Sequence, residues 1–141
     1  MKNALKRPLP VPNHDSRAYW DAAARQQLAY QYCNDCSRAQ FPPRAHCSHC
    51  HTGKPAWKIS KGVGRVYAVT VVHRAPTPAF RAAAPYALAL VDFDEGFRLL
   101  LNVRGAAPES LAIGQPVRAV FEPLDDGQWL PQAEVITQET A

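Results

Sequence analysis

The four cysteines of this chain form two Cys-x-x-Cys pairs, Cys33 with Cys36 and Cys47 with Cys50. Each pair can place two sulfurs on one ion, so together they supply a tetrahedral thiolate set that suits Zn2+. The ten residues between the pairs are fewer than the roughly 15–20 of most such ribbons, but they allow a short β-turn-β return. A segment this small cannot bury a core, so metal binding would supply its folding free energy. The spacing therefore predicts a closed, structural metal site.

Other uses of the four thiols are less consistent with the sequence. The first residues, MKNALKRPLPVPNHD, contain no apolar stretch after the lysines, so we expect no secretory signal and a cytoplasmic location, where thiols stay reduced. A thioredoxin-like site would need a βαβ setting, which the pattern lacks. Iron in the same four-sulfur set stays open. So does a ligand from His46, His49 or His51, although with four cysteines present we expect these histidines to be exposed or beside the site.

Helical periodicity is found only near the N-terminus. Three prolines, Pro8, Pro10 and Pro12, prevent a helix in the arm formed by residues 1–14. An N-cap at Asp15 or Ser16 then precedes a predicted helix over about 16–28. Its apolar stripe at helical spacing consists of Trp20, Ala23, Ala24 and Leu28. The aromatic residues at its start either hold the helix to its own domain or dock onto another protein.

From Gly62 onward the pattern is that of β-strands. Apolar residues on both faces of GVGRVYAVTVVHR predict a long, well-covered strand. Two further strands, YALALVDF and FRLLLNV, flank a DEG turn, and in the second of these alternate residues from Phe97 to Val103 face one way. Strands near 117–122 and over WLPQAEVI complete the set. The predicted fold is mainly β, with five strands closing into an OB-fold or SH3-like barrel. No apolar run approaches the roughly 20 residues needed to span a bilayer.

Charge is divided between the two ends of the chain. The first 81 residues hold 13 basic and 3 acidic residues, and the remainder holds 3 and 9. A basic half suits an anionic partner, such as nucleic acid, a phosphorylated cofactor or an acidic protein surface, unless the two halves simply attract each other.

No catalytic motif is present in the sequence. It contains no nucleophile elbow, HExxH, P-loop or GxGxxG pattern. A lone strand histidine such as His73 is usually structural, and carboxylates at a turn, such as Asp92, Asp94 and Glu95, are usually solvated. We therefore expect a binding protein rather than an enzyme acting alone.

Several motifs together resemble a known family. They are YW at 19–20, the two CxxC pairs with FPPR between them, Trp57 before Gly62 and Gly64, VYAVTVVHR, PYALALVDFDEG and IGQPV. In this order they resemble the zinc-ribbon/OB-fold proteins, a domain of unknown function, that accompany thiolase-like enzymes. Ser37 stands where the family commonly has Gly, and Phe97 where it often has Pro. The resemblance implies an N-terminal arm and helix (1–28), a rubredoxin-like zinc ribbon (29–56) and a five-stranded OB-fold barrel (57–141).

The resemblance also implies a role. Such proteins are non-catalytic accessory subunits of a thiolase, aldolase or acyltransferase acting on CoA thioesters, and related modules accompany hydratases. They assist assembly and shape the acyl-CoA site, so acyl-CoA is a candidate ligand shared with a thiolase-like catalytic subunit in a hetero-oligomer. Arginine suits the phosphates of CoA, and an apolar loop suits its acyl arm. The candidate contacts are Arg65, Arg74, Phe80 and Arg81.

Two other functions remain as alternatives. A single-stranded nucleic-acid-binding OB/zinc-ribbon protein would need aromatic platforms among basic residues on the central strands. Arg98 is the only basic residue between Tyr86 and Val103, so nucleic acid is not the expected partner. A rubredoxin-like electron carrier would require iron in the four-sulfur site.

Overall fold

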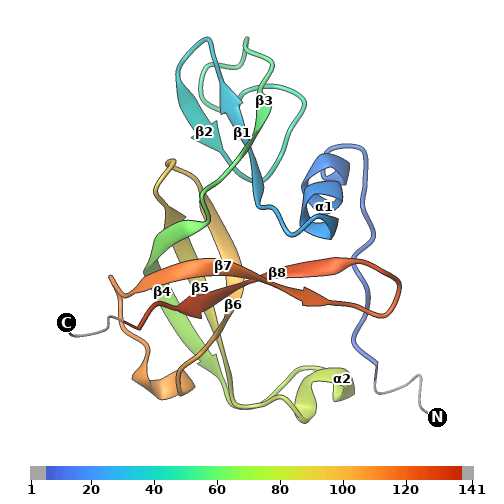
Figure 1. Ribbon diagram of the computed structural model, residues 1–141, viewed down its shortest axis with the longest axis vertical. Helices are drawn as coiled ribbons and strands as arrows, with labels where there is room; N and C mark the ends of the chain where they lie inside the picture. The colour runs from blue at the N-terminus through green and yellow to red at the C-terminus, as the bar shows by residue number, and fades with distance from the viewer. Residues whose placement is uncertain (1–5, 138–141) are drawn as a thin grey trace.

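The chain folds into a small three-stranded sheet above a five-stranded closed barrel, with one helix beside the junction (Figure 1). The structure is a computed structural model that describes residues 6–137; the predicted arm and barrel also include residues 1–5 and 138–141, which lie outside the described residues. The upper sheet has the order β2-β1-β3, and all its pairs are antiparallel. The elements of the upper part are α1 (Arg17–Ala24), β1 (Ala29–Cys33), β2 (Arg38–Gln40) and β3 (Ala56–Ile59).

The barrel has the order β4-β5-β6-β8-β7, and β7 pairs back onto β4. Its last strand lies between the third and the fourth, parallel to the third at Val103 and Ala133. This Greek-key closure is that of an OB-fold, so the predicted mainly β architecture is confirmed. Its elements are β4 (Val63–Val72), α2 (Pro78–Arg81), β5 (Tyr86–Phe93), β6 (Arg98–Arg104), η2 (Pro108–Ser110), β7 (Pro116–Pro123) and β8 (Trp129–Val135). No helix among residues 6–137 is long and apolar enough to cross a membrane.

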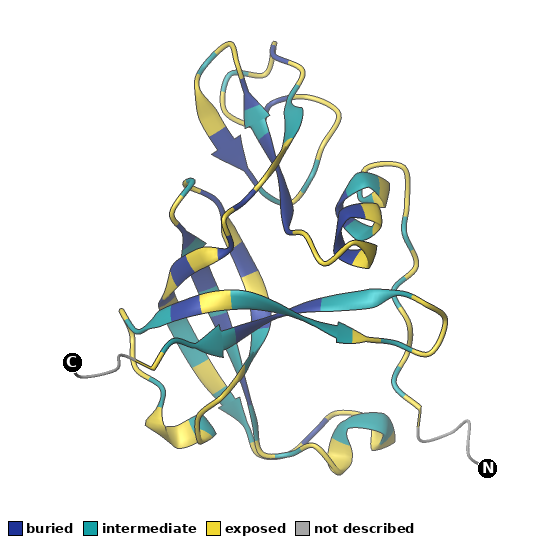
Figure 2. Cartoon of the chain, viewed as in Figure 1, coloured by how far each residue is buried: buried dark blue, intermediate teal, exposed yellow. Residues whose placement is uncertain are grey.

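Alternation along the strands decides which residues fill the barrel (Figure 2). On β6, Leu99 and Leu101 are buried and Leu100 is 58% exposed, as the alternating pattern predicts. The prediction of a well-covered β4 was wrong, because Val63 and Tyr67 are 38% and 49% exposed. A register shift between Val66 and Ala68 changes which alternate residues of β4 face the barrel interior. Apolar residues at both alternating positions of the sequence therefore do not mean that both faces of the strand are buried.

The first helix is shorter than predicted. It ends at Ala24, four residues before the expected end at Leu28. Gln26 has a φ of +57°, in the left-handed region, and the backbone N–H of Gln27 donates to the carbonyl of Ala22. The buried helical face consists of Tyr19, Ala22 and Ala23. The ring of Tyr19 packs edge-on against Phe41, 5.2 Å away between centroids, so the aromatic start of the helix contacts its own chain.

One hydrophobic core extends through both parts. Phe97, the residue just before β6, stacks on Phe93 at 4.9 Å and on Tyr30 of β1 at 4.7 Å between ring centroids. The connection between the parts is also fixed by Glu95, whose carboxylate accepts hydrogen bonds from the Ser60 hydroxyl (2.7 Å) and the Lys61 backbone N–H (2.8 Å). The ribbon and the barrel are thus joined by stacked rings and by a carboxylate that holds the linker.

Candidate functional site

The four cysteine sulfurs meet at the outer end of the upper sheet. Cys33 ends β1, Cys36 lies in the turn to β2, and the second pair lies between β2 and β3. All four Sγ atoms lie within 4.8 Å of one another, with Cys33 and Cys50 at 3.8 Å and Cys36 and Cys47 at 3.6 Å. A tetrahedral zinc ion with bonds of about 2.3 Å requires sulfur-sulfur edges of about 3.8 Å. The four cysteines are therefore positioned for metal binding.

The two pairs have the same local backbone. The residue after each pair donates its backbone N–H to the carbonyl of the pair's first cysteine: Ser37 to Cys33 at 2.8 Å, and His51 to Cys47 at 3.0 Å. Ser37 and His51 have φ values of +60° and +65°. This left-handed conformation favours glycine, so glycine would fit either position with less strain.

Gly53 lies against the sulfur cluster and was not identified from the sequence. A Cβ at this position would lie 2.4 Å from the Sγ of Cys33, so no side chain fits without displacing that sulfur. The Gly53 N–H also donates to the Sγ of Cys50 (3.4 Å), and its carbonyl accepts from the Cys47 N–H (2.8 Å). The only feature of the sequence that could have identified Gly53 is its position three residues after Cys50.

Backbone N–H groups favour the thiolate form at the second pair. Those of Thr52 and Gly53 hold the pKa of Cys50 at about 6, and those of Cys50 and His49 lower the pKa of Cys47. Burial raises the pKa of Cys36 to about 12. Four thiolates this close repel one another, so a divalent cation is the group that would let all four ionise together.

A buried amide pair positions the loop that carries the second cysteine pair. Gln31 and Gln40 are 5% and 4% exposed, and the Gln40 amide donates to Gln31 Oε1 at 2.7 Å. Gln31 exchanges two hydrogen bonds with the backbone of Arg44, and Gln40 Oε1 accepts the N–H of Ser48 at 2.7 Å. Side chains from β1 and β2 therefore hold the loop on both sides of Cys47.

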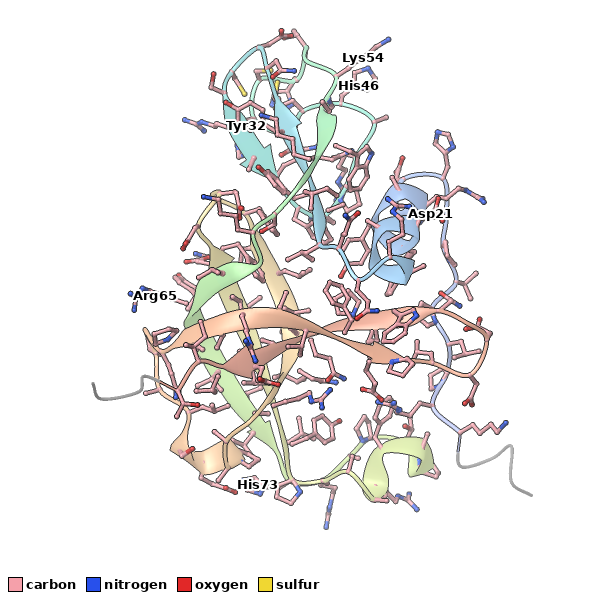
Figure 3. All side chains as sticks on the ribbon, viewed as in Figure 1. Asp21, Tyr32, His46, Lys54, Arg65 and His73 are labelled. Carbon is pink, nitrogen blue, oxygen red and sulfur yellow. The ribbon has the colours of Figure 1, made fainter. Side chains whose placement is uncertain are left out.

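The nearby histidines are not part of the sulfur cluster. Among the described residues, the group of metal-ligating side chains at this site contains the four cysteines and no histidine. A ring nitrogen of His49 lies 3.2 Å from the carbonyl oxygen of Ala39, and His46 is exposed at the outer end of the ribbon (Figure 3). Thus a histidine ligand, left open by the sequence, has no support in this geometry.

The candidate CoA contacts do not form one cluster. Arg65 lies near the start of β4, where its guanidinium donates to the Gly114 carbonyl at 3.0 Å. Arg74 follows the other end of the strand, about 30 Å of extended chain away; in Figure 3, Arg65 and His73 lie at different ends of β4. Phe80 and Arg81 are neighbours on α2, and Phe80 lines a cavity of about 400 Å³ and a second one of about 510 Å³ beside it.

Family models match the two parts of the chain separately. Residues 20–56 match the family described as the rubredoxin-like zinc ribbon domain of ChsH2. Residues 57–122 match the C-terminal OB-fold domain of ChsH2. The zinc-ribbon match and the four-sulfur cluster together support a structural zinc ion.

Individual relatives include scaffold proteins and enzyme subunits. A "DUF35 domain-containing scaffold protein" of Methanocaldococcus jannaschii is 36% identical over 67% of this chain and 70% of its own length. A "Probable enoyl-CoA hydratase alpha subunit" of Thermomonospora curvata is 40% identical over 79% of this chain, but the chain spans only 34% of that protein. A solved structure named "Ltp2-ChsH2(DUF35) aldolase" superposes with a TM-score of 0.80 at 35% identity, covering 90% of this chain and 98% of the matched one.

Proposed function

Because the chain belongs to the DUF35 family of zinc-ribbon and OB-fold proteins, we propose that it is a non-catalytic accessory subunit of an enzyme acting on CoA thioesters. The catalytic partner would be a thiolase-type subunit, that is, a thiolase, aldolase or acyltransferase, in a hetero-oligomer. The single observation that carries this proposal is the match over 98% of a chain in a structure named as an aldolase complex. The chain would assist assembly and help to shape the acyl-CoA site.

In this proposal zinc has a structural role. Cys33, Cys36, Cys47 and Cys50 would hold one Zn2+, and a closed four-sulfur site leaves no coordination position for a substrate. The ion would hold the two cysteine turns together and so make the ribbon rigid. The stacked rings of Tyr30 and Phe97 would connect this rigid ribbon to the barrel. A cytoplasmic location is part of the same proposal, because zinc thiolates require reduced cysteines. We also propose that the chain divides into an arm and helix (1–28), a zinc ribbon (29–56) and a barrel (57–141).

Contact with acyl-CoA would come from the region around α2. Phe80 lines both cavities there, and Arg81 follows it on an exposed position. Of the four candidate contacts, these two and Arg74, at the end of β4, could reach one ligand. Arg65 would need a separate role, because its guanidinium is engaged with Gly114 at the other end of the strand.

The test is co-expression with a thiolase-like subunit from the same genome, taking one whose gene adjoins the gene for this chain where there is one, followed by affinity purification through a tag on this chain. The proposal predicts a stable complex of fixed subunit ratio on size-exclusion chromatography. A chain that elutes alone, beside a partner that is fully active without it, would contradict the proposal.

A hydratase is the second candidate for the partner. The observation that favours it is the 40% identity to a protein named as a probable enoyl-CoA hydratase alpha subunit. The same purification distinguishes the two candidates if the chain is offered a thiolase-like and a hydratase-like subunit in parallel. The retained subunit identifies the reaction class.

A further inference from the structure

A groove lies on the outer face of strands β5 and β6. Tyr86 and Leu88 of β5 and Asn102 of β6 line it, with Leu130 of β8 and Phe80 of α2. The loop between β4 and β5 and the turn between β7 and β8 flank this face, which is where OB-folds bind their ligands. Its volume of about 400 Å³ falls within the range of small-molecule sites, roughly 300–1,000 Å³, and such sites are mostly apolar with a few polar groups.

The N-terminal arm forms the opposite wall of this groove. Residues 6–10, with the sequence KRPLP, line it along their whole length. The arm runs past the β7–β8 turn (Figure 1) and is attached to that hairpin at three points. The Arg7 guanidinium pairs with the Glu122 carboxylate, the Gln128 side-chain amide donates to the Pro10 carbonyl at 3.1 Å, and Lys6 lies 3.9 Å from Asp125. The Lys6 pair is exposed and adds little, so Arg7 and Gln128 hold the arm.

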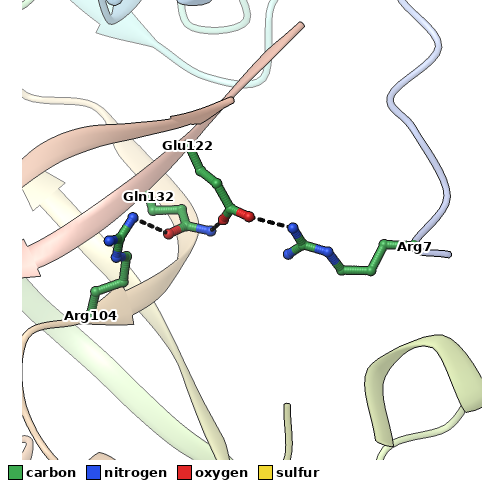
Figure 4. A network of polar contacts seen from close by, with 4 residues as sticks. All are labelled: Arg7, Arg104, Glu122 and Gln132. Atoms are coloured by element: carbon green, nitrogen blue, oxygen red, sulfur yellow. Dashed lines mark hydrogen bonds and ion pairs between the residues drawn. The ribbon is translucent and has the colours of Figure 1, made fainter. Parts of the chain in front are cut away.

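A polar chain behind the arm fixes the orientation of Glu122 (Figure 4). One carboxylate oxygen accepts from Arg7, and the other accepts from the side-chain amide of Gln132 at 2.5 Å. Gln132 is 4% exposed, and its carbonyl oxygen lies 3.5 Å from the Arg104 guanidinium. Because a buried amide holds one side of Glu122, the carboxylate presents its other side to the arm. Arg7 and Arg104 also line the second cavity, which adjoins the first at Phe80 and Tyr86.

We propose that this groove binds the acyl chain of a CoA thioester and that residues 6–10 are a strap that closes over it, fastened by Arg7 to Glu122. The inference rests on the proposed function, which supplies the ligand class. The hydrocarbon would contact the side chains of Phe80, Tyr86, Leu88 and Leu130. The guanidinium of Arg104, in the adjoining cavity, would face the polar end of the ligand. The strap contributes Pro8, Leu9 and Pro10 to the wall, so it has to move for the ligand to enter and has to return for full contact.

The groove is tested with the zinc-loaded full chain and two probes, octanoyl-CoA and free CoA, by isothermal titration calorimetry. We expect octanoyl-CoA to bind at least about tenfold more tightly than CoA. Leu88→Trp would fill the groove and remove that preference. Leu100→Trp is the matched control, because it makes the same change on the outer face of the neighbouring strand, at a residue that does not line the groove. Equal binding of the two probes, or equal effects of the two substitutions, would overturn the proposal.

The strap is tested with Arg7→Gln, Glu122→Gln and the double variant. Each single change should weaken octanoyl-CoA binding several-fold and raise its dissociation rate in stopped-flow measurements, because one wall is loosened. The double variant should resemble either single variant, since both break the same pair. Additive losses, or unchanged dissociation rates, would contradict a strap fastened at this point.

The outcome separates this inference from the proposed function. A chain that retains its catalytic partner but shows no preference for octanoyl-CoA over CoA refutes the groove and leaves the accessory role intact. A chain that binds octanoyl-CoA through Leu88 but retains no partner supports the groove and refutes the accessory role.

Discussion

The ring of Phe97 lies parallel to that of Tyr30, with 4.7 Å between centroids and 7° between planes. Tyr30 belongs to the ribbon sheet, and Phe97 lies between the DEG turn and the third barrel strand. Phe97 also stacks on Phe93 within the barrel. This side chain is therefore the central aromatic contact between the two parts.

Removing the Phe97 ring should destabilise the whole chain. Phe97→Ala leaves a cavity at a residue that is 2% exposed, and such a change costs about 3–5 kcal/mol. Denaturant unfolding followed by tryptophan fluorescence measures the loss. Leu100→Ala, three residues along and 58% exposed, should change stability by less than about 0.5 kcal/mol. Similar losses for the two variants would mean that the stack is not what joins the parts.

The metal site should depend on each cysteine and on none of the adjacent histidines. Cys47→Ser removes one of four thiolates from a buried position, so zinc should be lost and the ribbon should unfold. His46→Ala serves as the control, because this side chain is exposed and outside the sulfur cluster. Elemental analysis should find one zinc per chain in the control and none in Cys47→Ser. A metal content unchanged by Cys47→Ser would refute the site.

Zinc binding should depend on Gly53, although Gly53 is not a ligand. The Cβ of Gly53→Ala would collide with the Cys33 sulfur, so we expect zinc affinity to fall by about 10–100-fold, as when groups around metal ligands are changed. Competition with a chromogenic chelator measures it. The neighbouring change Lys54→Ala, at an exposed position, should have no effect. Equal zinc affinities of the two variants would show that the loop relaxes around the added methyl group.

Glycine at position 37 should stabilise the zinc-bound chain. Ser37 has a φ of +60°, which costs a residue with a side chain about 1–2 kcal/mol, while glycine loses about 0.5–1 kcal/mol more conformational entropy on folding. The balance predicts a gain of roughly 0.5 kcal/mol for Ser37→Gly, read as a higher denaturant midpoint. The control Arg38→Gly replaces the next residue, at the start of β2, and should lower the midpoint. A lower midpoint for Ser37→Gly would contradict the account of the turn.

Local sequence patterns predicted the elements whose geometry is set locally. The two CxxC spacings predicted the sulfur cluster, and the alternation from Phe97 to Leu101 predicted the buried face of β6. Both depend on residues near one another in the chain. The strand pattern alone was compatible with either an OB-fold or an SH3-like barrel, and the family resemblance favoured the OB-fold.

Most features that sequence reasoning missed depend on contacts distant in the chain. The exposure of Tyr67 follows from a register shift against β5. The early end of α1 is the exception, because it follows from the left-handed conformation of Gln26 within the same segment. The alternation placed Phe97 on a buried face, but its stacking on Tyr30 was missed because the two residues are far apart in sequence. The attachment of the arm through Arg7 and Glu122 spans 115 residues, and no local pattern records it.

The most direct test of the central claim is to titrate the purified catalytic partner with this zinc-loaded chain while thioester turnover is measured. An accessory subunit should raise turnover until a fixed ratio of the two proteins is reached and should give no turnover alone. Turnover by the isolated chain, or a partner whose rate does not respond to it, would contradict the accessory role.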